Sequence, residues 1–98
     1  MKIVFSEYAK LELEDAVRFY ELQYSGLGKK FKEEVRMAAL RIARYPTAWS
    51  SEAEEIRKCL LHKFPYKLLY SVESDHIFII AVTHQHRKPN YWIQKDDI

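Results

Sequence analysis

One short C-terminal stretch holds the residues best suited to chemistry. The sequence His84-Gln85-His86-Arg87-Lys88 follows an apolar run and is itself followed by Tyr91 and Trp92. Imidazole and phenol groups can transfer protons, and a guanidinium can hold a phosphate. Metal-free cleavage of RNA needs a base, an acid and cations around the phosphate. If the chain is a nuclease, the candidate catalytic residues are therefore His84, His86, Arg87 and Tyr91.

Positive charge gathers in the same part of the chain. Residues 56–92 contain six Lys or Arg against two acids, whereas residues 1–55 contain nine against ten. This asymmetry predicts an acidic partner for the C-terminal half, such as a nucleic acid or an acidic protein segment. The candidate phosphate-binding or partner-binding residues are Arg57, Lys58, His62, Lys67, Arg87 and Trp92. For Trp92, packing over the end of the sheet is the preferred interpretation.

The histidines raise the question of a metal site. On an extended strand His84 and His86 would share a face, and Cys59 and His62 could in principle complete a zinc site. No Cys-x-x-Cys or His-x-x-x-His spacing supports this, so we expect no metal and no cofactor. Cys59 is the only cysteine, which rules out an intrachain disulfide and favours a reducing cytoplasm. We interpret it as a small buried apolar residue.

Length and composition predict one ordered domain over residues 1–98. The chain is 48% hydrophobic and 14% aromatic, with only two glycines and three prolines. Such a composition is typical of a globular fold and not of a disordered segment. We also expect no membrane role, because no segment approaches the ~18 apolar residues that cross a bilayer.

The N-terminal half predicts one strand and two helices. Lys2–Phe5 is a short apolar run, and Ser6 after it is a suitable helix N-cap. Apolar residues then recur at steps of three and four up to Tyr24, where Ser25-Gly26 provides a stop. A second helix is expected to follow Gly28 and to end at about Tyr45, because Pro46 disfavours helical geometry in the residue before it. The small residues of that helix predict a close helical hairpin.

The C-terminal half switches to strand periods. We predict strands at Ile56–His62, Tyr66–Val72 and Ile77–Thr83, joined by compact turns into an antiparallel meander. The nearly continuous apolar run of the last strand predicts burial on both faces. Residues 47–55 are interpreted as a polar connector. The predicted fold is therefore α+β with the order β-α-α-β-β-β: a helical hairpin packed on one face of a small, mainly antiparallel sheet, with the first strand at its edge.

This order resembles the RelE/ParE superfamily of bacterial toxins. The most specific features are the hairpin Phe64-Pro65-Tyr66-x-Leu68-x-Tyr70 and the closing sequence His84-x-x-Arg87-x-Pro89-x-Tyr91-Trp92. The resemblance implies the toxin of a type II toxin–antitoxin module, often called a plasmid stabilisation protein. It implies a cytoplasmic protein that causes growth arrest and is neutralised by a cognate antitoxin, usually encoded beside it, in a toxin–antitoxin hetero-oligomer. The antitoxin wraps such a toxin with a helix or an added strand.

Members of this superfamily have one of two activities, and this chain shares residues with both groups. RelE-like members cut mRNA on the ribosome, and their pattern matches Lys58 and Arg87 here but has lysine at Leu60 and arginine at Lys67. The close at Pro89-x-Tyr91-Trp92 resembles the ParE-like branch, whose members bind DNA gyrase. We therefore expect gyrase binding. A metal-independent, ribosome-dependent endoribonuclease and a non-toxic antitoxin-binding member remain as alternatives.

Overall fold

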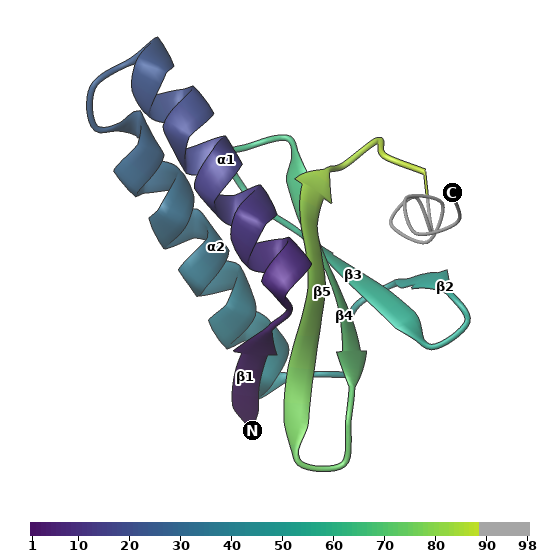
Figure 1. Ribbon diagram of the computed structural model, residues 1–98. Coiled ribbons are helices and arrows are strands. Elements are labelled where there is room, and N and C mark those ends of the chain that lie inside the picture. Colours follow the sequence, from purple (N-terminus) through teal and green to yellow (C-terminus); the bar gives the residue numbers. More distant parts are fainter. Residues whose placement is uncertain (89–98) are drawn as a thin grey trace.

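Two helices cover one face of a five-stranded sheet (Figure 1). The structure is a computed structural model, and it describes residues 1–88. The elements in chain order are β1 (Lys2–Phe5), α1 (Glu7–Gln23), α2 (Leu27–Arg44), β2 (Ser51–Ala53), β3 (Ile56–Leu60), β4 (Tyr66–Val72) and β5 (His76–His84). The predicted α+β class and the helical hairpin are confirmed.

The sheet is mixed, with the strand order β1-β5-β4-β3-β2. The pairs β2·β3, β3·β4 and β4·β5 are antiparallel, as the predicted meander requires. β1 lies at one edge and runs parallel to β5, with Lys2 opposite His76 and Phe5 opposite Ile79. A parallel pair needs a crossover connection, and here the whole chain from α1 to β4 supplies it.

One strand was not predicted. β2 lies within residues 47–55, which the sequence indicated to be a polar connector. Its three residues are too few to show a period-two pattern, and Ser51 and Glu52 are not typical strand formers. The strand exists because it pairs with β3, Ser51 lying opposite Arg57.

The start of α1 follows from its predicted cap. The Ser6 hydroxyl accepts a hydrogen bond from the Ala9 N–H at 2.9 Å. It also donates to the Ile80 carbonyl oxygen at 2.9 Å, so that the same side chain ties the helix to β5. β1 is therefore fixed between the cap of α1 and its neighbour β5.

The core lies between the helical hairpin and the sheet. Its fully buried large side chains include Phe31 and Ile42 from α2 and Leu68, Tyr70, Ile77 and Ile79 from the sheet. Phe31 also packs against Tyr20, Phe64 and Tyr66, with ring centroids 4.9 to 5.2 Å apart. These aromatic contacts connect the helices to the start of β4, where the candidate site lies.

The second helix, α2, begins at Leu27, two residues before the predicted start. Gly26 has φ 89° and acts as its N-cap, and Gly28 lies inside the helix. A Cβ at position 28 would be 2.6 Å from the Val17 carbonyl oxygen of α1. Gly28 therefore sets a close approach between the two helices, as the sequence had suggested for the alanines further along α2.

Candidate functional site

The candidate site lies at one end of the sheet, where β4 begins and β5 ends. Tyr66 is opposite His84, and Lys67 is opposite Thr83. The Gln85 N–H donates to the Pro65 carbonyl oxygen at 2.9 Å, which holds the chain after β5 against the β3–β4 turn (Figure 1). The structure thus brings Lys67, His84 and Arg87 to the same end of the molecule.

Lys67 is buried within an ion-pair network. Its ammonium Nζ lies 3.1 Å from Glu52 Oε2 and 3.1 Å from the Arg87 carbonyl oxygen. The second carboxylate oxygen of Glu52 lies 3.5 Å from Lys58 Nζ. The side chains of Lys67 and Glu52 are only 3% and 5% exposed, whereas that of Lys58 is 37% exposed. One carboxylate therefore serves two of the predicted phosphate-binding lysines.

Sequence reasoning did not single out Glu52. The residue stands in the polar segment before β3, with two other acids close by at Glu54 and Glu55. Only the pairing of β2 with β3 brings Glu52 close to Lys58 and Lys67. The one signal in the sequence was that Lys58 and Lys67 lie on adjacent predicted strands, where two ammonium groups would need a counter-charge if they were buried.

Arg57 does not join this group. It lies opposite Tyr70 and alternates with Lys58, so it points to the helix-covered face of the sheet. Its guanidinium donates to the carbonyl oxygens of Thr47 at 3.2 Å and Trp49 at 2.8 Å. These hydrogen bonds hold the segment between α2 and β2 in place. The guanidinium of Arg57 therefore has a structural role here.

The two C-terminal histidines are neighbours at the surface. The rings of His84 and His86 are 5.5 Å apart, and the His86 N–H donates to His84 Nδ1 at 3.3 Å. The His84 ring also lies 5.9 Å from Tyr66, and burial raises the pKa of that phenol. Arg87 follows on the same exposed turn. His84, His86 and Arg87 together form a small basic surface able to bind an anion or exchange protons.

Four other predicted residues have different outcomes. His62 lies in the turn between β3 and β4, where its backbone N–H donates to Glu34 of α2 at 3.2 Å. Tyr91 and Trp92 lie outside the described residues, so their predicted roles stay predictions. Cys59 is completely buried, and burial raises the pKa of its thiol, as expected for a residue of the core.

An open groove of about 510 Å³ adjoins His84 and Arg87. One wall is the outer face of α1, with Tyr8, Leu11 and Phe19, and the other is the end of β5. Glu12 lies between them, and its carboxylate accepts a hydrogen bond from the Val82 N–H at 2.8 Å. Glu12 therefore accepts a backbone hydrogen bond at the edge of β5, beyond the residues of β5 that pair with β1.

Neither a metal centre nor a membrane segment is found in the described part of the chain. Within residues 1–88, no group of three or more His, Cys, Asp or Glu side chains is arranged to hold a metal ion. No helix there is long and apolar enough to cross a membrane.

Comparisons with solved structures give the same fold. The chromosomal ParDE toxin–antitoxin system of P. aeruginosa contains a chain with a TM-score of 0.71 and 17% identity, matched over 86% of this chain and 95% of that one. The isolated E. coli RelE toxin matches with a TM-score of 0.57 and 19% identity, over 98% of this chain and 96% of that one. At these identities the likeness concerns the fold alone.

Sequence comparison gives a family. Among curated proteins, none matches this chain. The family described as ParE toxin of type II toxin–antitoxin system, parDE, matches residues 3–89, which include all the elements described above except Lys2, the first residue of β1. The resemblance predicted from the hairpin and the closing sequence is thereby confirmed, and the chain belongs to the ParE toxin family of type II toxin–antitoxin systems.

Proposed function

We propose that this protein is a toxin that binds DNA gyrase and does not cut RNA. The observation that supports this reading is the environment of Lys67. A lysine that holds a scissile phosphate must present its ammonium to solvent or substrate. Here the Lys67 side chain is 3% exposed, and its ammonium already contacts the Glu52 carboxylate and the Arg87 carbonyl.

Glu52 also works against a phosphate electrostatically. An RNA phosphate placed beside Lys58 and Lys67 would lie next to a buried carboxylate, and like charges repel most strongly where water is excluded. To bind there, the phosphate would have to displace Glu52 and leave it without a counter-charge, which is costly for a buried acid. A surface that binds another protein can do so without displacing Glu52 from the two lysines.

The proposed partner in the resting state is a cognate antitoxin, and the complex is a hetero-oligomer. The family membership supports this, since the family is defined by type II toxin–antitoxin systems. Growth arrest, stabilisation of a plasmid and action in the cytoplasm, where gyrase works, belong to the same proposal.

Two parallel reactions test the target. The purified protein is added to a DNA supercoiling reaction with gyrase and to a translation extract programmed with mRNA. We expect inhibition of supercoiling, with gyrase trapped on DNA, and intact mRNA on the ribosomes. Inactivity in both reactions, together with no growth arrest on expression, would identify a non-toxic antitoxin-binding member.

The endoribonuclease remains the second candidate because of His84 and His86. Their rings are 5.5 Å apart and exposed, beside Arg87. His84→Ala and Arg87→Ala separate the two readings. If ribosome-bound mRNA is cut by the wild-type protein and not by these variants, the gyrase proposal is wrong and the histidine surface is a nuclease site.

A further inference from the structure

A short turn carries the exposed basic side chains at the end of β5. We call residues 84–87 the histidine turn. The Arg87 N–H donates to the His84 carbonyl oxygen at 3.0 Å, which closes the turn. The Gln85 N–H donates to the Pro65 carbonyl oxygen at 2.9 Å, which holds the turn against the segment before β4. Both of these contacts use backbone groups only.

A buried side chain holds the end of the histidine turn. Lys67 Nζ donates to the Arg87 carbonyl oxygen at 3.1 Å and lies 3.1 Å from Glu52 Oε2. The side chains of Lys67 and Glu52 are 3% and 5% exposed, so close packing fixes the position of the ammonium. One buried ammonium therefore links the interior of the sheet to an exposed turn.

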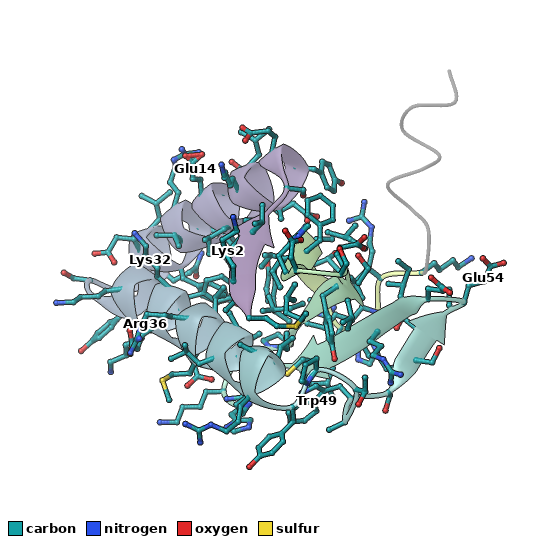
Figure 2. All side chains as sticks on the ribbon, turned by 90° about the horizontal axis from the view of Figure 1, so that it is seen from below. Lys2, Glu14, Lys32, Arg36, Trp49 and Glu54 are labelled. Atoms are coloured by element: carbon teal, nitrogen blue, oxygen red, sulfur yellow. The ribbon has the colours of Figure 1, made fainter. Side chains whose placement is uncertain are left out.

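Lys67 points to the face of the sheet that the helical hairpin does not cover. Its neighbour Leu68 belongs to the core under the helices, and successive side chains of a strand alternate between the two faces. Both figures show the turn between β2 and β3, where Figure 2 labels Glu54, and the yellow end of the described chain on the side away from the helices (Figure 1, Figure 2). The ion pair therefore joins β2, β4 and the histidine turn on that side of the sheet.

Stability alone does not account for a buried ion pair at this place. The desolvation of two charges offsets much of their attraction, and a well-packed apolar pair of similar volume is often as stable. An apolar pair could not, however, donate a hydrogen bond to the Arg87 carbonyl oxygen. The contact with the histidine turn is thus the part of the network that apolar side chains could not replace.

We propose that Lys67 is a positioning residue, which holds the histidine turn in the conformation that contacts the target of the toxin. Glu52 fixes the ammonium, and the ammonium fixes the turn through its backbone. A surface that is ordered before binding loses less conformational entropy when it binds. Lys67 itself does not touch the target, in agreement with its burial. The inference rests on the proposed function for the identity of the target as gyrase.

A double variant separates position from stability. Glu52→Leu with Lys67→Met replaces the ion pair with apolar side chains and removes the donor to the turn. Urea unfolding verifies that this protein keeps the wild-type stability. We expect it to inhibit gyrase supercoiling about tenfold more weakly or worse, because a hydrogen bond from a charged donor contributes at least about that factor. If the double variant does not fold, Glu52→Gln with Lys67→Met repeats the comparison with a polar partner left for Lys58.

Tyr70→Phe is the matched control. This variant also loses a hydrogen bond from a buried side chain to a backbone carbonyl oxygen, that of Pro46, but not one at the histidine turn. Its inhibition of gyrase should equal that of the wild type even though its stability is lower. An equal loss of inhibition in the control and in the double variant would show that only stability matters, and would overturn the proposal.

Amide hydrogen exchange measures the turn without any target. In the double variant we expect faster exchange at the N–H groups of Gln85 and Arg87, and unchanged exchange in the part of β5 that pairs with β4. Full inhibition by the folded double variant, or wild-type exchange at both turn amides, overturns the proposal.

Failure of the proposed function gives a different pattern. If the wild-type protein does not inhibit gyrase, the gyrase proposal is wrong, and the same variants are compared by growth arrest on expression. Growth arrest that is lost in the double variant and kept in Tyr70→Phe supports the positioning role for another target. A wild-type protein without any effect on growth overturns the inference as well, because the histidine turn then has no target to contact.

Discussion

At the level of single residues, Glu52 neutralises part of the positive charge of the basic C-terminal half. Lys58 and Lys67 were predicted from the sequence to hold a phosphate. In the structure they surround one buried carboxylate, with Nζ to carboxylate distances of 3.5 and 3.1 Å. The network also reaches the Arg87 carbonyl and so fixes the turn after β5. A basic sequence is therefore not equivalent to a basic surface.

Removal of Glu52 should be far more damaging than removal of the whole pair. Glu52→Ala leaves the Lys67 ammonium buried without a counter-charge, which we expect to lower the free energy of unfolding by about 3–5 kcal/mol. The double variant Glu52→Leu, Lys67→Met replaces the pair with apolar groups and should be close to the wild type. Urea unfolding of the three proteins measures this. Equal losses in both variants would show that the network contributes through shape alone.

The buried Tyr70 predicts that the protein loses stability at alkaline pH. Its side chain is fully buried, its hydroxyl donates to the Pro46 carbonyl oxygen at 2.6 Å, and burial raises its pKa from 10.0 to about 12. Above pH 10 the unfolded chain loses this proton while the folded chain keeps it. The stabilising contribution is therefore complete below about pH 10 and is lost as the pH rises through about 12.

Tyr70→Phe separates this effect from that of other groups. Near neutral pH the variant should be less stable by about 1 kcal/mol, because it lacks the hydrogen bond. Between about pH 10 and 12 the wild type should lose stability more steeply than the variant. The raised pKa values of Tyr20 and Tyr66 are common to both proteins, so they cancel. Parallel stability curves from urea unfolding across this range would contradict the assignment.

At the level of elements, the helical hairpin depends on a missing side chain. Alanine favours a helix by about 1 kcal/mol over glycine. At Gly28, however, a Cβ would lie 2.6 Å from the Val17 carbonyl oxygen, a backbone atom that cannot move without displacing α1. Tertiary contact therefore opposes helix propensity at this position.

Substitution of Gly28 decides which effect is larger. We expect Gly28→Ala to destabilise the protein by a net ~1–2 kcal/mol, because overpacking costs about 1–3 kcal/mol. Lys30→Ala, on the exposed side of the same helix, should change stability by less than about 0.5 kcal/mol. Thermal unfolding of both variants tests this. A more stable Gly28→Ala protein would show that the helices separate at little cost.

β2 shows the limit of a local reading. Its strand character comes from pairing with β3, and its main contribution is to place Glu52 beside the two lysines. A three-residue strand without apolar alternation leaves no periodic signal. The candidate site could therefore not be predicted at this point, although β3, β4 and β5 were predicted within one or two residues.

At the level of the whole molecule, two grooves flank α1. One adjoins His84 and Arg87, and the other lies between β1 and α2, with a volume of about 560 Å³ and a lining that includes Ile3, Phe5 and Leu40. The proposed function, in which one protein holds the toxin inactive and a second is its target, needs surfaces for both. The two grooves lie on different sides of one helix, which is consistent with separate roles.

Salt should weaken the proposed complex with an antitoxin if Lys29 and Lys32, the two lysines beside the groove between β1 and α2, contribute to it. The screening length falls from about 30 Å at 0.01 M to about 3 Å at 1 M ionic strength, so exposed charge pairs lose most of their attraction over that range. We expect the dissociation constant of the wild-type complex to rise with salt. It should rise less for the Lys29→Glu, Lys32→Glu variant, as titration calorimetry can measure. A wild-type affinity independent of salt would indicate apolar anchoring alone.

The sequence by itself determined the fold class, the helical hairpin, the three long strands and the family. These depend on signals carried by near neighbours: the Ser6 cap, the three-and-four spacing of apolar residues, the alternation in the strands and the hairpin around Tyr66. It also placed Lys67, His84 and Arg87 at one end of the sheet, since antiparallel neighbours fix which residues face each other.

Only the tertiary structure decided which charges are available to a partner. Glu52 neutralises Lys67 from a distance of 15 residues in the chain, Arg57 turns to carbonyl oxygens on the other face, and Lys29 and Lys32 stay unpaired within the described residues at the rim of an apolar groove. The physical reason is that burial and counter-charge depend on which segments meet in space. Residue type and spacing along the chain do not contain that information.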